Sequence, residues 1–229
     1  MATEVKQQAT PVSSKPVSGI RTEEFWVRNG KYIAYVIGGI LLLIGAWFVY
    51  QEYVVAPKEK QAMEAMWKAE SYYRMDSSRL ALNGDGVNRG FVRIISQYGG
   101  TKAGNLARYY AGISYLKLGD FNNAIKQLKD FSTDDDLLKV RTAGALGDAY
   151  AESGKKAEAA DQYRKAGTLY EEDNFNSPEY LFRAGLLYQE LGKNKEAIEV
   201  FRIIKDKYLA SQQGRDIDKY LARLGDVRD

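Results

Sequence analysis

Three stretches of the chain carry the same pattern of small and aromatic residues, and this repetition limits the folds open to it. The pattern runs glycine, tyrosine, glycine, alanine and a large apolar residue, at intervals of three, four, five and four positions. It begins at Gly112, Gly147 and Gly185, at spacings of 35 and 38 residues. Self-similarity at such a period is typical of stacked helix pairs, so an all-α helical solenoid is predicted.

Each position in the pattern has a physical role. The first glycine and the alanine, such as Gly112 and Ala124, are expected where two helices cross closely, because a larger side chain would push the helices apart. The tyrosine is expected to fill the space beneath this crossing. The second glycine, at Gly119, Gly154 and Gly192, is expected to end the first helix in a left-handed conformation. Each stretch is therefore predicted to be a helix, a turn and a helix.

These recurring residues resemble those of the tetratricopeptide repeat. The position that is usually tryptophan holds Arg108, Ala143 or Leu181 here, and the terminal proline is missing. The resemblance implies three repeats within residues 101–210, in a looser and shorter superhelix than a long repeat array. Residues 211–229 are predicted to be a C-terminal capping helix, since terminal repeats need a polar outer face.

The residues before the repeats, 51–100, are predicted to be a degenerate helix pair. Apolar residues at spacings of three and four predict one helix over 57–82, and the Asn-Gly-Asp-Gly sequence at 83–86 predicts a turn. This turn lacks the glycine and lysine of a phosphate-binding loop and the oxygen ligands of a calcium loop. A second helix is predicted over 87–97, with the Gly-Gly pair at 99–100 as its C-terminal cap.

Polar segments between the repeats are interpreted as helix ends. The acidic run at 134–136 could hold a cation, but capping of the next helix is the favoured interpretation. The acidic run at 171–173 is interpreted as a solvated helix end that could contact a neighbouring Lys or Arg. Ser177 and Pro178 are predicted to be the N-cap and the first residue of a helix.

Residues 32–50 form a run of 19 without a charged side chain. As a helix the run would reach roughly 28 Å, close to the ~30 Å hydrocarbon core of a bilayer. Aromatic residues at both ends, including Tyr32 and Trp47, resemble the interfacial belts of membrane spans. A buried core helix would need a larger protein around it, and a signal peptide has a shorter apolar run. A single retained transmembrane helix is therefore predicted.

Residues 1–31 are predicted to be a disordered cytosolic tail with a short juxtamembrane helix that starts at Thr22. Three Lys or Arg lie within 15 residues before the apolar run and two within 15 after it, which favours a cytosolic N-terminus by a narrow margin. Within the run, Gly38, Gly39 and Gly45 would let another transmembrane helix approach closely, although small residues also occur in solitary anchors.

Composition excludes several functional classes. The chain has no cysteine and no histidine, so it lacks disulfides, a thiol nucleophile, the usual general base and zinc sites built from these residues. Residues 51–229 hold 28 Lys or Arg and 27 Asp or Glu, a balance unlike a nucleic-acid footprint. We expect no enzyme, no cofactor, no metal, no nucleic acid and no small-molecule substrate.

Function is expected on the concave surface, where tetratricopeptide repeats usually bind extended or helical peptides. Apolar residues on such a surface suggest a low-specificity groove, whereas burial under the N-terminal pair or the capping helix would make them ordinary core. The predicted groove consists of side chains on the first helix of each repeat that point away from the second helix: Tyr109, Ile113, Leu116, Lys117, Arg141, Asp148, Glu152, Phe182, Leu186 and Gln189.

The whole layout also resembles the YfgM family of bacterial inner-membrane proteins. The resemblance rests on the Asn-Gly-Lys run at 29–31, the Gly-Ala-Trp at 45–47 that ends the span, and the repeats that follow. It implies a cytosolic tail, a periplasmic repeat domain and an ancillary role at the Sec translocon beside a membrane-anchored periplasmic prolyl-isomerase-like chaperone. We therefore expect a membrane-anchored interaction protein that holds this partner or unfolded client segments. The alternative is a structural scaffold for another envelope assembly, in outer-membrane biogenesis or secretion.

Overall fold

The computed structural model describes the backbone of residues 22–227 and the side chains of residues 29–227. The predicted tail over residues 1–21 lies outside this range. Within it, all regular structure is helical apart from one isolated β-bridge between Gly84 and Arg89. The all-α fold class is thus confirmed. The chain divides into two compact units, 1–52 and 53–229, and each is described by itself.

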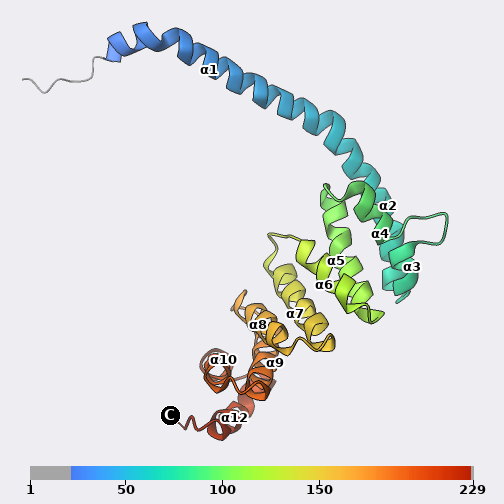
Figure 1. The fold of residues 1–229 in the computed structure, drawn as a ribbon, viewed down its shortest axis with the longest axis vertical. Helices are drawn as coiled ribbons and strands as arrows, with labels where there is room; N and C mark the ends of the chain where they lie inside the picture. The colour runs from blue at the N-terminus through green and yellow to red at the C-terminus, as the bar shows by residue number, and fades with distance from the viewer. Residues whose placement is uncertain (1–21, 228–229) are drawn as a thin grey trace, which may run out of the picture. The chain divides into compact units, whose positions relative to one another are not determined.

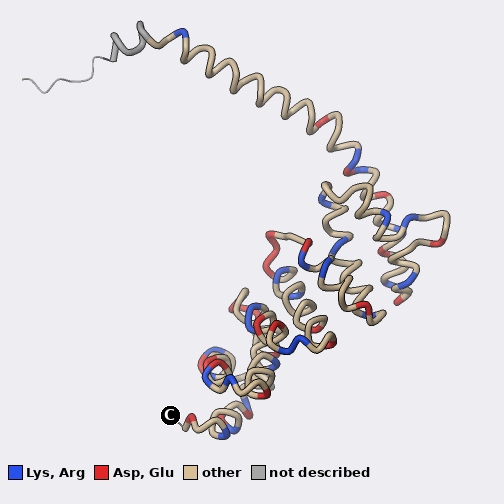
Figure 2. Tube along the Cα trace, viewed as in Figure 1, with Lys and Arg blue, Asp and Glu red and all other residues tan. Residues whose placement is uncertain are grey.

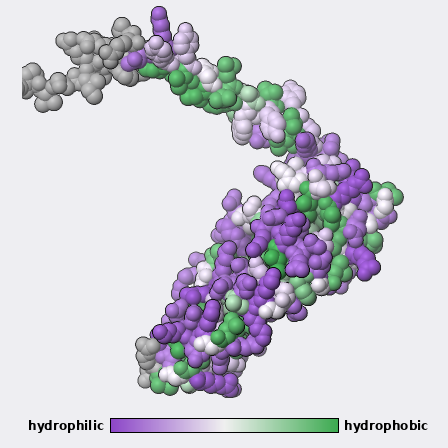
Figure 3. All heavy atoms as spheres, in the orientation of Figure 1, coloured by the Kyte–Doolittle hydropathy of each residue, from purple (hydrophilic) through white to green (hydrophobic). Residues whose placement is uncertain are grey.

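The first unit contains helix α1 (Thr22–Tyr50), which joins the predicted juxtamembrane helix and the predicted span into one helix. Figure 2 shows no Lys, Arg, Asp or Glu along the run predicted to span the membrane. Its apolar side chains lie open at the surface, as the green atoms of Figure 3 show. Among the described residues, this is the one helix long and apolar enough to cross a membrane, and a signal sequence would meet the same criteria. A five-residue π-helix, η1 (Gln51–Val55), follows α1 along the chain.

The second unit is a series of short helices in which each packs on the next (Figure 1). The first helices of the repeats, α5, α7 and α9, also contact one another, as the stacked pairs of a solenoid do. The elements are α2 (Ala56–Arg74), α3 (Ser78–Asn83), α4 (Phe91–Tyr98), α5 (Lys102–Lys117), α6 (Phe121–Asp130), α7 (Asp136–Glu152), α8 (Lys156–Thr168), α9 (Asn176–Glu190), α10 (Asn194–Lys207), α11 (Gln212–Arg215) and α12 (Ile217–Arg223).

The repeating glycines have the roles that the sequence predicts. The second glycine of each pattern is left-handed, with φ of 78° at Gly119, 77° at Gly154 and 70° at Gly192. The first glycine lies against the large residue that ends the same pattern, so that an added Cβ would come within 2.5 Å of Leu128, Tyr163 or Phe201. The close helix crossing therefore depends on the missing side chain.

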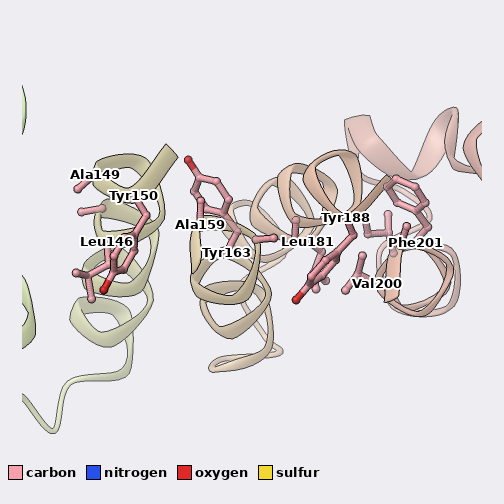
Figure 4. Packing of buried hydrophobic residues seen from close by; sticks show 14 of the residues in the cluster. Leu146, Ala149, Tyr150, Ala159, Tyr163, Leu181, Tyr188, Val200 and Phe201 are labelled. Atoms are coloured by element: carbon pink, nitrogen blue, oxygen red, sulfur yellow. The ribbon is translucent and has the colours of Figure 1, made fainter. Parts of the chain in front are cut away.

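The core is continuous through the second and third repeats. The alanines of the three patterns are fully buried, as are Leu181, Val200 and Phe201. Figure 4 shows these side chains meeting between α7, α8, α9 and α10, with the pattern tyrosines Tyr150 and Tyr188 among them. A second core cluster joins α2, α3 and α4 to α5. Both clusters bury the apolar faces that a single helix pair could not cover alone.

The predicted single helix over 57–82 is wrong, because the chain breaks between α2 and α3. Asp76 takes a left-handed φ of 55°, and the N–H of Ser77 donates to the carbonyl of Tyr72. This is the hydrogen-bond pattern of a Schellman cap, with an aspartate in place of the usual glycine. No glycine or proline stands at this break. The spacing of the apolar residues therefore predicted one helix that continued through it.

The next helix begins later than predicted. The carboxylate of Asp85 accepts the backbone N–H groups of Val87 and Asn88, at 2.9 and 2.6 Å, which holds these residues in a turn, and α4 starts at Phe91. The Gly-Gly pair after α4 is not a left-handed cap, because Gly99 has a φ of −57° and Gly100 has no positive φ.

The polar segments between the repeats act as helix caps, with two errors in the prediction. Asp135 accepts the N–H of Leu138 at 2.8 Å and caps α7, as expected. Ser177 is not an N-cap: it lies inside α9, fully buried, and its hydroxyl donates to the carbonyl of Tyr170 at 2.9 Å. Pro178 is the third residue of α9 and not the first. The start of α9 is held instead by Asp173, whose carboxylate accepts the N–H of Asn176 at 2.8 Å.

Candidate functional site

The ten residues of the predicted groove lie on α5, α7 and α9, and we call this surface the A-helix face. On α5, Tyr109, Ile113 and Leu116 are half-buried and pack against the core, whereas Lys117 is exposed. The three half-buried residues therefore contribute both to the core and to the surface. The remaining groove residues are Arg141, Asp148 and Glu152 on α7, and Phe182, Leu186 and Gln189 on α9; of these, Arg141, Glu152 and Leu186 are exposed and the others half-buried.

An ionic group joins α7, α8 and α9 on this face. The carboxylate of Asp148 accepts a hydrogen bond from the hydroxyl of Tyr163 at 2.7 Å and from the guanidinium of Arg183 at 3.0 Å. Arg183 also donates to Glu179, one turn earlier, at 2.7 Å. Asp148 is thus fixed by two neighbouring helices. Burial, helped by the bond to Asp148, raises the pKa of Tyr163 far above its ordinary value, so this hydroxyl stays a donor.

A second group consists of one arginine that interacts electrostatically with two tyrosines. Burial raises the pKa of Tyr109 on α5 and of Tyr180 on α9, and in both cases the charge of Arg141 opposes the rise. Arg141 therefore interacts electrostatically with both tyrosines. It makes no ion pair with the described residues, although Asp173 is near enough for Arg141 to help lower its pKa against the effect of burial. An exposed arginine beside half-buried aromatic rings can bind a carboxylate, a backbone carbonyl or an aromatic ring.

Tyr180 and Arg183 were missed by the sequence analysis. The ring of Tyr180 stacks on Tyr163, with centroids 6.1 Å apart, and it lies over Gly144, where an added Cβ would come within 2.3 Å of it. Gly144 occupies the register position of Tyr109 and Phe182 in the other repeats. A glycine at a position that is otherwise aromatic is the signal that a ring from the next repeat fills the space.

The two ends of the A-helix face are partly covered. At the α5 end, Lys117 pairs with Asp76 at 2.7 Å and lies over the ring of Tyr73; the bond to Asp76 raises the pKa of this lysine. At the α9 end, Phe182 contacts Tyr220 of α12 edge-to-face at 4.9 Å. Phe182 and Leu186 still line a shallow pocket of about 380 Å³ together with α11 and α12. Arg141, between these two ends, is exposed.

Neither unit offers a metal site in its described part, where no group of three or more His, Cys, Asp or Glu could hold an ion. In α1, an added Cβ at Gly38, Gly39 or Gly45 would meet nothing within 4 Å. These glycines therefore leave the surface of α1 open.

Comparison with models of protein families gives three matches. Residues 23–137 match a tetratricopeptide repeat-like domain, which covers half of the chain. Residues 140–173 and 179–208 each match a tetratricopeptide repeat. No curated protein matches the chain. The two repeat matches begin and end close to the helix pairs α7–α8 and α9–α10.

Proposed function

The chain belongs to the tetratricopeptide repeat-like domain family and carries a protein–protein interaction module, and we propose that it binds an extended or helical segment of a partner protein across the A-helix face. The observation that carries the proposal is the group of Arg141, Tyr109 and Tyr180 at that face. Tyrosine and arginine are the residue types that dominate binding energy at protein interfaces, where their apolar parts are buried and their polar ends find partners.

The neighbouring residues on the A-helix face fit the same role. The carboxylate of Asp148 and the guanidinium of Arg183 are already fixed against each other, so a bound backbone would meet polar groups that lose little freedom on binding. Ile113, Leu116 and Leu186 add apolar surface on either side of the centre. Glu152 and Gln189 supply polar groups at the far ends of α7 and α9. We propose no catalytic activity, cofactor, nucleic acid or small-molecule substrate.

We further propose that α1 anchors the protein as a single-pass span of a bacterial inner membrane, with the N-terminus in the cytosol and residues 53–229 in the periplasm. The uncharged run of 19 residues and its open apolar surface support the anchor. The charge bias around the run supports the orientation. The open surface at Gly38, Gly39 and Gly45 would suit contact with another span.

The resemblance to the YfgM family supports the most specific form of the proposal. The partner would be a membrane-anchored periplasmic isomerase or chaperone, the protein would be an ancillary subunit of the Sec translocon, and unfolded client segments would be further ligands of the A-helix face. The proposed role at the translocon is supported by this resemblance alone, whereas the interaction module is supported by the fold.

The test is purification of the full-length protein from native membranes in mild detergent, followed by mass spectrometry of what is retained. Translocon subunits and a periplasmic isomerase are expected with the wild type and lost with Arg141→Ala combined with Tyr180→Ala. The matched control is Lys126→Ala combined with Lys195→Ala, two exposed residues outside the A-helix face, which should retain the partners. Retention of outer-membrane assembly or secretion components in their place would contradict the translocon role and favour the scaffold.

A further inference from the structure

We propose that the chain has a second peptide-binding site, a pocket between α6, α7 and α8 that takes an acidic segment carrying a large apolar side chain. None of the ten groove residues lines this pocket, which takes Lys139, Thr142 and Leu146 from α7; its lining residue Phe131 packs against Tyr109 of the A-helix face, with ring centroids 5.5 Å apart. The proposal therefore does not depend on binding at the A-helix face.

The floor of the pocket is apolar. Leu128 from α6 and Ala143 and Leu146 from α7 are buried there, and Phe131 and Leu169 close its sides. The hollow measures about 420 Å³, within the usual range of ligand pockets, which leaves room for one large side chain and its neighbours. An apolar anchor residue would fit this floor.

The rim of the pocket is positive. Lys129, Lys139 and Lys165 line it, and no aspartate or glutamate does. Lys139 pairs with Asp136 at 2.8 Å, and Lys129 lies over the ring of Tyr150, at 5.8 Å from its centroid, where the charge of Glu158 also acts on it. Lys165 makes no ion pair with the described residues. Three lysines that line an apolar hollow with no carboxylate in its lining favour a ligand that brings carboxylates next to an apolar group.

An unpaired acceptor points to a peptide in preference to a fatty acid or another apolar anion. Gln162 lines the pocket, and its buried Oε1 has no hydrogen-bond donor among the described residues. A backbone N–H would supply that donor after a small movement of the side chain, whereas a fatty acid has only acceptors to offer at neutral pH. Peptide backbone, acidic side chains and one apolar side chain together satisfy all three features of the pocket.

The test uses full-length protein in detergent and a fluorescein-labelled peptide, Ser-Leu-Glu-Asp-Leu-Gly, with binding measured by fluorescence anisotropy. Its control peptide has Gln and Asn in place of Glu and Asp. Lys129→Gln combined with Lys165→Gln should weaken binding of the acidic peptide roughly tenfold, and the same positions changed to Arg should keep it within about twofold. The matched pair Lys126→Gln with Lys195→Gln removes the same charge elsewhere and should leave the affinity unchanged.

A second pair of variants tests the role of the acceptor. Gln127 stands at the register of Gln162 one repeat earlier, and its Oε1 is also buried and unpaired, but it does not line the pocket. Gln162→Leu should weaken binding several-fold, and Gln127→Leu should not. Circular dichroism melting of each variant shows whether the fold is retained.

Three results would overturn the proposal. One is equal affinity for the acidic and neutral peptides. Another is an equal loss of affinity in the two double variants, Lys129→Gln with Lys165→Gln and Lys126→Gln with Lys195→Gln, which would indicate a nonspecific charge effect. The third is displacement of the peptide by dodecanoate at the same occupancy, which would make the site one for amphiphilic anions. If Arg141→Ala removes peptide binding and the pocket variants do not, the peptide binds at the A-helix face, so failure here is separable from failure of the proposed function.

Discussion

The paired helices approach closely because the residue at their crossing is glycine, which has a hydrogen atom where alanine has a methyl group. At Gly185 the nearest atom to an added Cβ would be a ring carbon of Phe201, at 2.2 Å, and Phe201 is fully buried. The ring has no room to move away. Gly112 and Gly147 face Leu128 and Tyr163 in the same way, so the contact is a property of the repeat and not of one pair.

Gly185→Ala should therefore destabilise the protein. Alanine favours a helix over glycine by about 1 kcal/mol, but overpacking of a rigid core costs about 1–3 kcal/mol, and the steric term should win. We expect a net loss of up to about 2 kcal/mol in urea unfolding. Gly100→Ala is the control, since a Cβ there meets nothing within 4 Å. A stabilised Gly185→Ala variant would show that the crossing is loose.

Ionisation of Tyr188 makes the free energy of unfolding depend on pH in the alkaline range. Burial, together with a hydrogen bond from its hydroxyl to Asp161 at 2.8 Å, raises the pKa of Tyr188 to about 12. Its contribution to stability is complete below the unfolded tyrosine pKa of about 10 and is lost as the pH rises through about 12. Tyr188→Phe should lower the free energy of unfolding by about 1 kcal/mol at pH 7 and flatten its decline between pH 10 and 12. An unchanged pH slope would contradict this assignment.

Helix ends depend on single side chains that the repeat pattern does not include. Asp135 caps α7 through the N–H of Leu138, while its neighbour Asp134 is exposed and bonded to nothing that the structure describes. Asp135→Ala should cost about 1 kcal/mol in thermal or urea unfolding, as the loss of an N-cap does. Asp134→Ala should be close to neutral. Equal effects of the two would mean that the acidic run acts as a diffuse charge.

Helix α12 covers the end of the solenoid with the buried Ile217 and Leu221 and with one half-buried aromatic residue. The ring of Tyr220 contacts Phe182 at 4.9 Å and Phe201 at 5.6 Å. Tyr220→Ala should lower stability by about 2 kcal/mol, since a half-buried ring is lost together with its aromatic contacts. It should also speed proteolysis within α12. The exposed neighbour variant Lys219→Ala should do neither, and protection of α12 in Tyr220→Ala would contradict its role as an anchor.

The sequence predicts best those elements in which a position requires one residue type for one physical reason. The left-handed glycines and the crossing glycines recur in register, and each role could be stated from spacing alone. The break at Asp76 could not be predicted in this way, because an aspartate there takes the left-handed conformation that glycine usually adopts. The late start of α4 depends on Asp85, and the start of α9 on Asp173; both are backbone-binding carboxylates in sequences that also suit a helix.

The candidate site was only half predictable for a related reason. Arg141 and Asp148 could be placed on the A-helix face from the register of one repeat. Tyr180 and Arg183 reach that face from the next repeat, over Gly144 and onto Asp148, so their role depends on how two repeats stack. The cover that Tyr220 places on Phe182 likewise comes from an element outside the repeats.

The molecule combines one long apolar helix with a repeat unit in which most charges lie at the surface. Ion pairs join neighbouring helices of that unit, such as Arg108 of α5 with Asp130 of α6 and Arg164 of α8 with Glu199 of α10. Exposed pairs of this kind contribute little each, so the stacking of the repeats depends on their apolar faces. Arg141, on the A-helix face, makes no ion pair with the described residues and shares this with Lys129 and Lys165.

The central claim is that the A-helix face binds a protein segment, and crosslinking in living cells tests it most directly. A photo-crosslinking amino acid replaces Glu152, an exposed residue of the A-helix face, in the full-length chain, and a second strain carries it in place of Lys195, which is exposed outside that face. We expect one defined protein adduct from position 152, weakened by Arg141→Ala combined with Tyr180→Ala, and none from position 195. An adduct from position 195 alone, or equal adducts from both positions, would contradict it.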